Sequence, residues 1–414
     1  MPKRTIGQVD VTGRRVLMRV DFNVPLDDGR ITDERRIVQA MPSIRSVLDR
    51  GGRLILMSHL GRPEGKGFEE AFSLEPVAVR LGEILGREVG LAADCVGADV
   101  ATRAAAMRNE ECLLLENLRF HAEETLIDKA KKNPDKHLTP EQASCVEAFA
   151  ESLASLGNLY CNDAFGTCHR RHVSMYDVPM KLGAGRRVCG YLLKKELQFL
   201  GDALHAPRRP FVAILGGAKV SDKIGVIDNL LPKVDRLLVA GAMAYTFFAA
   251  RGMGVGKSLC EQDKVDLARR LIDKAGDKLM LPIDSVCAEE LRAGVETRVC
   301  EGAIPDDMMG LDIGPRTMEK FTSVVRSAKT VIWNGPAGAF ETKPFNAGTM
   351  ALARALAEAT KAGATTIIGG GDSAAAVDQA GLADAMTHIS TGGGASLEFL
   401  EGKPFPTIDI LDEA

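Results

Sequence analysis

The stretch FVAILGGAKVSDK, residues 211–223, joins a short apolar run to a turn that contains two glycines. Five apolar residues in succession are typical of a strand that is buried on both faces, as in a parallel sheet. Longer amphipathic stretches, such as residues 34–50, separate this run from others of the same kind. The alternation predicts an α/β fold. The other runs are RVLMRVDF (15–22), RLILMSH (53–59), ECLLLEN (111–117), NLYCNDA (158–164), RLLVAGA (236–242), LMLPIDS (279–285), TVIWNG (330–335), TTIIGGG (365–371) and HISTGGG (388–394).

The length of the chain and one leucine stripe predict how it is divided. A chain of 414 residues exceeds one ordinary core, so we expect two domains. Between the halves, residues 191–207 carry leucines at helical spacing before Pro207. We predict two doubly wound, Rossmann-like parallel-sheet domains, 1–189 and 207–393, joined by a hinge helix, 190–206. The charged stretch 128–142 is expected to be a solvated loop.

Composition excludes several classes of protein. The net charge of −4 argues against a general nucleic-acid binder, and no run approaches the length of a membrane span. Nine cysteines, an odd number without a CxxC pair, indicate reduced thiols and a cytoplasmic protein. One cluster of cysteines and histidines is not expected to bind zinc. The spacing of its residues fits no common zinc pattern, and Cys161 ends an apolar run. The cluster consists of Cys161, Cys168, His169 and His172.

Basic side chains follow the apolar runs of the first half. In open α/β sheets, ligands bind beyond the carboxyl ends of the strands. Several arginines at neighbouring strand ends repel one another unless an anion joins them, and arginine suits bidentate contact with phosphate or carboxylate. Each arginine alone is as well explained by a surface ion pair; the set predicts a small polyanionic ligand. Its members are Asp21, Asn23, Arg36, His59, Arg62, Arg119, His169 and Arg170.

Glycines follow the runs of the second half. Such turns let main-chain N–H groups approach a phosphate, and the helix that follows adds favourable potential. Asp372, within one of these turns, fits a magnesium ligand. A single glycine turn is explained as a tight turn, but four of them predict a nucleotide. The residues concerned are Gly216, Gly217, Lys219, Lys223, Gly241, Gly314, Asn334, Glu341, Gly369 to Asp372 and Gly392 to Gly394.

The stretch GMGVGKS, residues 252–258, imitates a phosphate-binding P-loop. A P-loop requires G-x-x-x-x-G-K-[ST] directly after a buried strand, and here Arg251 stands where the first glycine belongs. The preceding run, AMAYTFFAA, has the character of a helix. We therefore interpret GMGVGKS as the end of a helix followed by an exposed lysine.

Eight motifs, in this order, resemble phosphoglycerate kinase, and the resemblance covers nearly the whole chain. They are RVDFNVP, SHLGRP, LLENLRF, NDAFGTCHR, GGAKVSDK, WNGPAGAFE, GGGDSAAAV and STGGGASLE. The resemblance implies an N-terminal domain for 3-phosphoglycerate or 1,3-bisphosphoglycerate and a C-terminal domain for Mg-ADP or Mg-ATP. It also implies a C-terminal segment, 394–414, that returns to the N-terminal domain. Small-molecule substrates, no nucleic acid or membrane partner and a monomeric state are expected.

The resemblance also implies the roles of individual residues. The glycerate site is expected at Asp21, Phe22, Asn23, Arg36, His59, Leu60, Gly61, Arg62, Arg119 and Arg170. The nucleotide site is expected at Gly217, Lys219, Lys223, Gly241, Gly314, Asn334, Glu341, Gly370, Gly371, Asp372 and Ser373, with Asp372 as the Mg²⁺ ligand. The positions near the transferred phosphoryl group are Arg36, Lys219, Gly371 and Gly394. AGAMAY stands where many members carry an extra glycine, and this departure weakens the assignment of Gly241 as a nucleotide contact.

Two other classes of protein fit the sequence less well. A nicotinamide dehydrogenase needs G-x-G-x-x-G in a first βαβ unit, and no strand end offers it. A two-lobed solute-binding protein normally carries an export signal and has no use for the GGGDS loop. Transfer between an acyl phosphate and ADP needs no base, so the expected catalysis is alignment and stabilisation of charge, with domain closure to exclude water.

Overall fold

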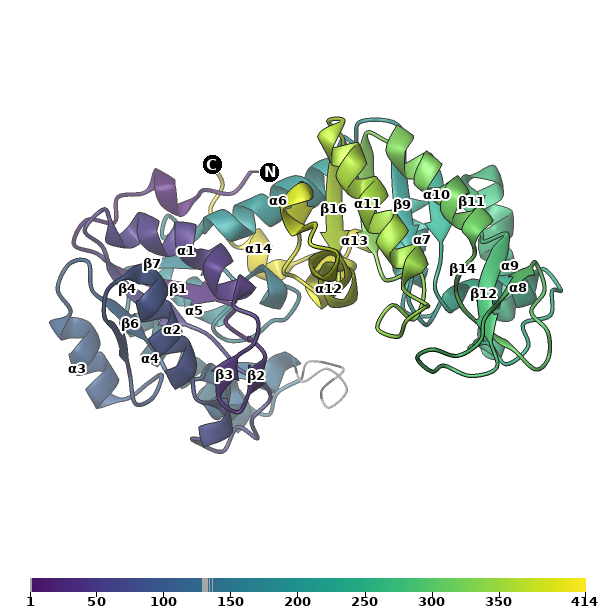
Figure 1. Ribbon diagram of the computed structural model, residues 1–414. Helices are drawn as coiled ribbons and strands as arrows, with labels where there is room; N and C mark the ends of the chain where they lie inside the picture. Colours follow the sequence, from purple (N-terminus) through teal and green to yellow (C-terminus); the bar gives the residue numbers. More distant parts are fainter. Residues whose placement is uncertain (1, 129–132, 134, 136) are drawn as a thin grey trace. The chain divides into compact units, whose positions relative to one another are not determined.

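The computed structural model describes residues 2–128, 133, 135 and 137–414. They form two compact units, Met1–Leu197 with Pro404–Ala414, and Gln198–Lys403 (Figure 1). The boundaries at 189, 206 and 393 stay a prediction for the functional domains. In this grouping the leucine helix α6 (Tyr191–His205) contributes residues to both units, and the returning tail begins at Pro404.

A parallel sheet of six strands forms the centre of the first unit. Its middle strand β1 is the run Arg15–Val20, whose side chains after Arg15 are all buried, as expected for a strand covered on both faces. All six strands point the same way, so their carboxyl ends share one edge. In sheet order they are β5 (Val89–Leu91), β6 (Cys112–Leu114), β4 (Arg53–Met57), β1, β7 (Leu159–Asp163) and β8 (Arg187–Cys189).

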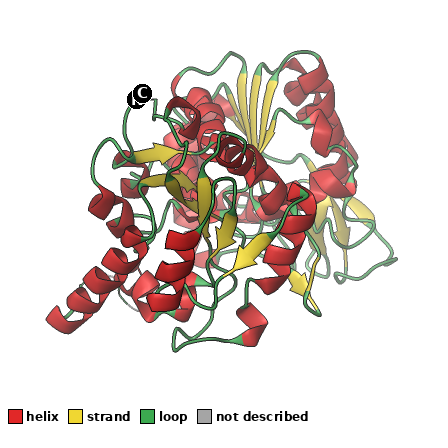
Figure 2. Ribbon diagram, turned by 90° about the vertical axis from the view of Figure 1, so that its left-hand side faces the viewer, coloured by secondary structure: helices red, strands yellow, loops and turns green. Residues whose placement is uncertain are grey.

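Helices flank this sheet and bury their apolar faces against it (Figures 1 and 2). Apolar residues of β1, β4, α1 and α2 form one core cluster. The two chain termini lie side by side, because Lys3 pairs with Glu413 in an antiparallel bridge. The helices are α1 (Arg35–Leu48), α2 (Glu75–Leu85), α3 (Ala98–Ala106), α4 (Pro140–Ser155), α5 (Asp177–Leu182) and α14 (Pro406–Asp409).

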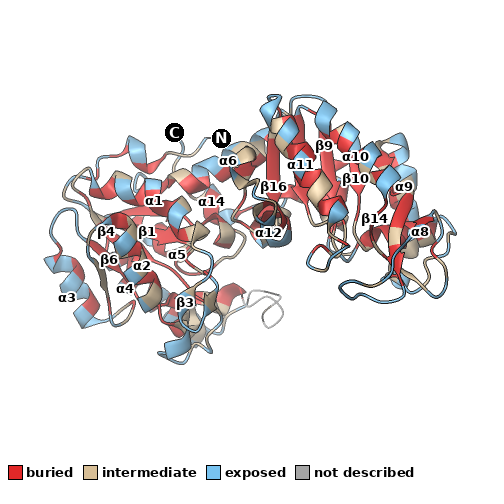
Figure 3. Cartoon of the chain, in the orientation of Figure 1, coloured by how far each residue is buried: buried red, intermediate tan, exposed pale blue. Residues whose placement is uncertain are grey.

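The second unit repeats the plan with another parallel sheet of six strands. The apolar run FVAIL is its strand β9, Phe211–Leu215, and all five side chains are buried (Figure 3). The sheet order is β11 (Leu279–Met280), β10 (Arg236–Val239), β9, β15 (Thr330–Asn334), β16 (Thr365–Gly369) and β17 (His388–Ile389).

Seven further helices belong to the described part of this unit, and its core includes Trp333. The helix expected before GMGVGKS is confirmed as α8 (Met243–Ala250). The others are α7 (Ile224–Leu230), α9 (Val265–Ala275), α10 (Pro315–Ser327), α11 (Ala347–Lys361), α12 (Gly371–Gln379) and α13 (Gly394–Leu400). The predicted fold class, two doubly wound parallel sheets, is confirmed.

Helix α6 follows the predicted leucine stripe. Leu193, Leu200 and Leu204 are buried and Leu197 is half-buried, and the helix ends at His205, two residues before Pro207. Its first turn is held by Asp163 at the carboxyl end of β7, which accepts a hydrogen bond from the main chain of Leu193 (3.0 Å).

Several elements differ from the prediction. The run 279–285, predicted as one strand, divides at Pro282. Leu279–Met280 is an edge strand of the parallel sheet, and Asp284 begins a separate antiparallel sheet that was not predicted. That sheet has the order β13 (Arg298–Glu301), β12 (Asp284–Ala288) and β14 (Met309–Ile313). A hairpin of β2 (Leu26–Asp27) and β3 (Arg30–Ile31) was not predicted either. The expected loop 128–142 lies partly outside the described residues, and from Pro140 onward it is helix α4.

None of the helices in the described part of the chain has the length and apolar character that crossing a bilayer requires. All nine cysteines lie among the described residues, and all are free thiols.

Asp284 fixes the start of helix α10. Its buried carboxylate accepts hydrogen bonds from the main-chain N–H groups of Arg316 (3.0 Å) and Thr317 (2.8 Å), and from the Thr317 hydroxyl (2.5 Å). These N–H groups belong to the first turn, where a helix offers no acceptor of its own. The capping carboxylate therefore joins β12 to α10.

Asp284→Ala is expected to lower the free energy of unfolding of the second unit by about 2–4 kcal/mol, because buried donors lose their acceptor. Trp333, the single tryptophan, is fully buried in this unit, so its fluorescence during urea unfolding measures the loss. Asp266→Ala removes an exposed first-turn carboxylate of α9 and should change the free energy by less than about 0.5 kcal/mol. Equal losses in both variants would contradict the capping role.

Candidate active site

The predicted anion-binding residues of the first unit lie at the shared carboxyl edge of its sheet. Asp21 to Asn23 follow β1, and His59 to Arg62 follow β4. Arg119 lies in the 3-10 turn η3 (Leu118–Phe120) after β6, and His169 and Arg170 lie beyond β7. The strands β6, β4, β1 and β7 are consecutive in the sheet. The fold therefore brings the ends of four neighbouring strands together.

Polar contacts fix several of these residues to one another. Arg36, in the first turn of α1, donates from Nη1 to Asp21 Oδ1 (2.8 Å). Asn23 Oδ1 accepts from the Gly61 main-chain N–H (2.8 Å), and Arg119 Nη1 donates to the Gly61 carbonyl (2.6 Å). The loops after β1, β4 and β6 are therefore joined at Gly61.

Other predicted residues are placed differently. Phe22 and Leu60 are buried, so they present only main-chain atoms to a ligand. Arg62 is exposed. Arg170 is half-buried and lies 3.8 Å from the buried carboxylate of Asp128, so it has an acidic partner within the protein.

A buried charge network lies beneath this edge. Arg19 of β1 is fully buried and donates from Nε to Ser174 Oγ (2.9 Å). Ser174 in turn donates from its hydroxyl and its main-chain N–H to Glu124 (2.6 and 2.9 Å). Arg19 Nη2 and His172 Nδ1 each lie 3.9 Å from Glu124 Oε1. Burial raises the pKa of Glu124, and the charge of Arg19 opposes that rise.

Arg19 also determines which ring nitrogen of His59 carries the proton. Arg19 Nη2 lies 3.1 Å from His59 Nδ1. A guanidinium can only donate, so Nδ1 is the acceptor and the proton of the neutral ring is on Nε2. Burial, followed by the charge of Arg119, holds the pKa of His59 well below its usual range. Burial, followed by the charge of Arg19, also lowers the pKa of Arg119 to about 10, as expected for crowded cations.

The second unit carries a cavity at the carboxyl ends of β9, β15, β16 and β17. Its volume is about 390 Å³, close to that of cavities elsewhere in the chain, so the lining distinguishes it rather than the size. Many predicted nucleotide residues line it. They are Gly217, Lys219, Lys223, Asn334, Gly370, Gly371, Asp372, Ser373 and Gly394.

Helix α12 begins at this cavity. Gly370 is its N-cap, with a φ of +91° that favours glycine, and Gly371, Asp372 and Ser373 form the first turn. The N–H groups of a first turn have no acceptor within the helix and carry partial positive charge. The cavity thus has the features of an anion site built from main-chain groups.

Two polar side chains meet at the floor of the cavity. Lys223 Nζ donates to Asn334 Oδ1, and burial lowers the pKa of this lysine. Asn334 Nδ2 is buried and has no hydrogen-bond partner within the described protein. A buried donor without an acceptor costs free energy, which a bound acceptor would recover. Lys219 and Asp372, by contrast, are exposed at the rim.

Three predicted nucleotide residues do not line this cavity. Gly241 packs behind it: a Cβ there would lie 2.6 Å from the Gly217 nitrogen. Gly314 precedes α10 and lies against Asp284, and Glu341 is exposed in the loop after β15.

Comparison with known proteins matches nearly the entire chain to one family. The model of the family described as phosphoglycerate kinase matches residues 6–403. The chain belongs to the phosphoglycerate kinase family. It is 54% identical to a phosphoglycerate kinase of Rhodopirellula baltica over 418 residues, covering 100% of both chains. The solved phosphoglycerate kinase of Coxiella burnetii is 38% identical, with a TM-score of 0.85 and coverage of 99% of this chain and 98% of that one. The phosphoglycerate kinase of Pyrococcus horikoshii OT3 superposes with a TM-score of 0.81 at 28% identity, again over 99% and 98% of the two chains.

The stretch GMGVGKS has its main-chain groups engaged locally in this family member. Lys257 donates its N–H to the Met308 carbonyl (2.7 Å), and a Cβ on Gly256 would meet the Pro305 carbonyl oxygen at 2.1 Å. The Ser258 hydroxyl accepts from the Gly310 N–H (2.9 Å). The segment follows helix α8 and packs against residues 304–310, which is unlike a phosphate-wrapping loop.

The cysteine–histidine cluster lies in the core of the first unit. Cys161 and Cys168 are fully buried. Cys168 Sγ lies 3.4 Å from the Ala164 carbonyl oxygen, whereas His172 faces Glu124. These side chains have separate partners.

Sequence reasoning missed the network of Arg19, Glu124 and Ser174. One signal was present: RVLMRVDF places an arginine within a run that otherwise reads as a strand buried on both faces. Its partners lie 105 or more positions away and have no pattern of their own.

Arg19→Met is expected to lower the free energy of unfolding by about 3–5 kcal/mol, because Glu124 loses a buried cation. Adding Glu124→Gln should recover part of that loss, which urea unfolding followed by circular dichroism would measure as a coupling free energy. Arg269→Met, which breaks an exposed pair with Asp266, should change the free energy by less than about 0.5 kcal/mol. Additive effects of the two buried changes would show that Arg19 and Glu124 act independently.

Proposed function

We propose that the chain transfers a phosphoryl group reversibly between 1,3-bisphosphoglycerate and ADP, giving 3-phosphoglycerate and ATP. Membership of the phosphoglycerate kinase family supports this reaction. The observation that carries the proposal is the pair of half-sites: one sheet edge supplies arginines, and the other supplies glycine turns, lysines and a helix N-terminus. Both substrates are small anions.

The first half-site suits the glycerate substrate. Arg36, Arg62, Arg119 and Arg170 provide guanidinium groups for its phosphate and carboxylate. Asp21 and Asn23 position Arg36 and the Gly61 loop through the bonds described above. Neutral His59 offers an Nε2–H donor for a hydroxyl or carboxylate without adding charge. Phe22 and Leu60 hold the loops in place from the core.

The second half-site suits the nucleotide. The first-turn N–H groups of α12, with Gly217 and Lys223, would bind phosphate oxygens. Asn334 Nδ2 is the buried donor that a bound oxygen satisfies. Gly241, Gly314 and Glu341 stand outside the cavity lining, and we propose them as contacts for the rest of the nucleotide.

The residues around the cavity also fit Mg²⁺. Asp372 places one exposed carboxylate at the rim of the cavity, which suits a magnesium ion that takes its remaining ligands from substrate phosphates and water. Asp372 would hold the ion. When bound, Mg²⁺ neutralises phosphate charge.

Catalysis then depends on alignment and charge. The attacking carboxylate is already ionised, so no general base is needed. Arg36, Lys219 and the main-chain N–H groups of Gly371 and Gly394 are proposed to stabilise the charge on the transferred group. Arg36 belongs to the first unit and the other three to the second. Transfer therefore requires the two units to close on the substrates, which also excludes water from the acyl phosphate.

The setting of the reaction is also proposed. Nine free thiols are typical of a reducing compartment, which supports a cytoplasmic enzyme. A monomer suffices for the mechanism, because one chain supplies both half-sites.

The proposed reaction is tested by following ATP consumption with 3-phosphoglycerate and Mg²⁺, against the same mixture without the acid. ATP consumption that depends on the acid, with 1,3-bisphosphoglycerate as product, supports the proposal. The absence of acid-dependent turnover in folded protein would overturn it.

Lys219→Ala should lower kcat by about 10²- to 10³-fold with a smaller change in KM, because the exposed ammonium is proposed to contact the moving group. Steady-state kinetics in the same assay measures both constants. A change confined to KM would assign Lys219 to ground-state binding.

Lys223→Ala should weaken Mg-ADP binding at least tenfold, because it removes a buried cation from the cavity floor. Lys257→Ala, in GMGVGKS, is the matched control and should change the affinity by less than about twofold. Isothermal titration calorimetry with Mg-ADP compares the two variants. The opposite order of effects would restore GMGVGKS as the nucleotide site.

A further inference from the structure

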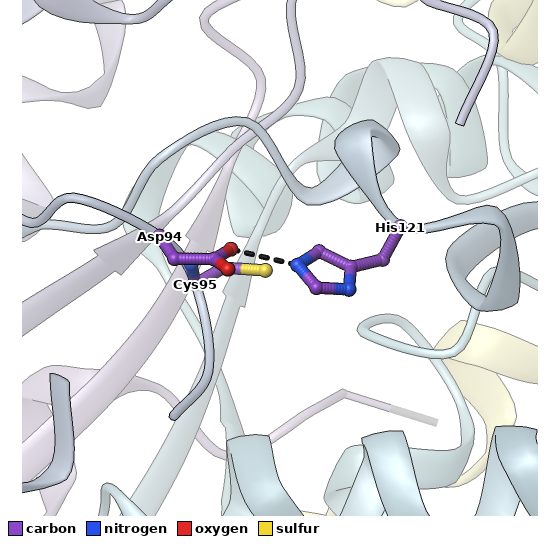
Figure 4. A group of neighbouring side chains, drawn as sticks. All are labelled: Asp94, Cys95 and His121. Carbon is purple, nitrogen blue, oxygen red and sulfur yellow. Dashed lines mark hydrogen bonds and ion pairs between the residues drawn. The ribbon is translucent and has the colours of Figure 1, made fainter. Parts of the chain in front are cut away.

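Three metal-binding side-chain types converge at the far end of the carboxyl edge of the first sheet. Asp94 and Cys95 lie in the loop that follows edge strand β5, and His121 directly follows η3. A carboxylate oxygen, Cys95 Sγ and a ring nitrogen of His121 all lie within 4.8 Å of one another. Figure 4 shows the three side chains pointing toward one another, with His121 Nε2 2.7 Å from Asp94 Oδ1. The residues of the two half-sites do not include them.

We propose that Asp94, Cys95 and His121 form a zinc-binding site. Thiolate, imidazole and carboxylate are the ligands that Zn²⁺ prefers among divalent cations. A tetrahedral zinc ion spaces such ligand atoms about 3.3–3.6 Å apart. The present separations need adjustments of about an ångström to reach that spacing. Asp94 and His121 are partly exposed, with side-chain exposures of 46% and 26%, so water can occupy a fourth position.

The surroundings hold two of the ligands in place. The ring of His121 stacks on Phe149 of α4, with centroids 5.2 Å apart. Cys95 is fully buried, and its main-chain N–H donates to Asp94 Oδ1 (2.6 Å). Glu123 and Glu124 act electrostatically on His121 and Cys95 respectively, and their negative charge favours a cation. Such outer contacts orient ligands and raise metal affinity.

Zinc binding at this site must displace protons. A thiol is mostly protonated at neutral pH, whereas zinc binds the thiolate of Cys95. Forming the Zn–S bond releases that proton to solvent. A second proton leaves wherever the ring of His121 starts as an imidazolium, because zinc binds the neutral imidazole. One to two protons are therefore released for each zinc ion bound.

A zinc ion here would join three segments of the first unit. Lys66 pairs with His121 in an antiparallel bridge, and Gly67 donates its N–H to the Phe120 carbonyl (3.0 Å). The ion would thus fasten the loop after β5 to η3 and to the segment after β4. This proposal rests on the three ligands alone and does not depend on the proposed function.

The test uses the full-length protein with cobalt(II) and then zinc alone, without nucleotide and with excess Mg²⁺ to occupy oxygen-only sites. We expect one equivalent of cobalt to give a thiolate-to-metal charge-transfer band and the strong visible bands of tetrahedral coordination, and zinc to remove both. Calorimetry in buffers of different ionisation enthalpy should count one to two protons released. No charge-transfer band in the wild-type protein would overturn the proposal, whatever the variants do.

Variants assign the site. Cys95→Ser should abolish the charge-transfer band and weaken zinc binding at least about 100-fold, and His121→Gln should weaken it to a similar degree. Cys145→Ser, which changes an exposed cysteine of α4, is the matched control and should retain both band and affinity. A band that persists in Cys95→Ser, or that is lost in Cys145→Ser, would place the metal elsewhere and overturn the proposal.

Discussion

The loops after β9 and β15 pack main chain against main chain, and the cavity proposed to hold the nucleotide depends on that contact. A Cβ on Gly216 would lie 2.1 Å from the Pro336 carbonyl oxygen, and one on Gly335 would lie 2.3 Å from the Gly216 carbonyl oxygen. No side chain fits between the two loops, because real Cβ atoms do not approach that closely. Their close approach sets the floor on which Lys223 and Asn334 meet, and it leaves open the cavity that α12 faces.

The two proposed half-sites owe their positive potential to different groups. In the second unit the positive potential comes from the main-chain dipoles of a helix N-terminus together with Lys219 and Lys223. In the first unit it comes from guanidinium groups, and these require support from below. Arg19 and Glu124 supply that support as a buried pair, stabilised by the two hydrogen bonds from Ser174. Removing one partner of a buried ion pair costs several kcal/mol of stability, because the other charge is left uncompensated. The pair therefore holds in place the side chains that lie over it at the sheet edge.

The sequence was most informative where a local rule was sufficient. Continuous apolar runs identified β1, β4, β9 and β15, and the leucine stripe identified α6. The fold class followed from the alternation of apolar runs with amphipathic stretches, and the family followed from the strand-end motifs. Prediction failed where pairing partners or burial decide the structure. β5 and β8 have three residues each and no distinctive pattern, and the antiparallel sheet around β12 depends on partners that follow in sequence without a tight-turn signal. Arg19 gave a local anomaly, but Ser174 and Glu124 could only be found in three dimensions.

Three histidines at or beneath the carboxyl edge of the first sheet, His59, His169 and His172, are held neutral. Burial is the largest cause in each case: it lowers the pKa of His169 to about 4 and holds the pKa values of His59 and His172 well below their usual range. Arginine does not titrate near neutrality. These three histidines therefore take up no protons when the surrounding solution acidifies moderately. Asp163 at the carboxyl end of β7 differs, because burial raises its pKa to about 7. At the proposed glycerate half-site these histidines would add no charge as the solution acidifies, so the ionisation of the ligand and of Asp163 would be the sources of pH sensitivity there.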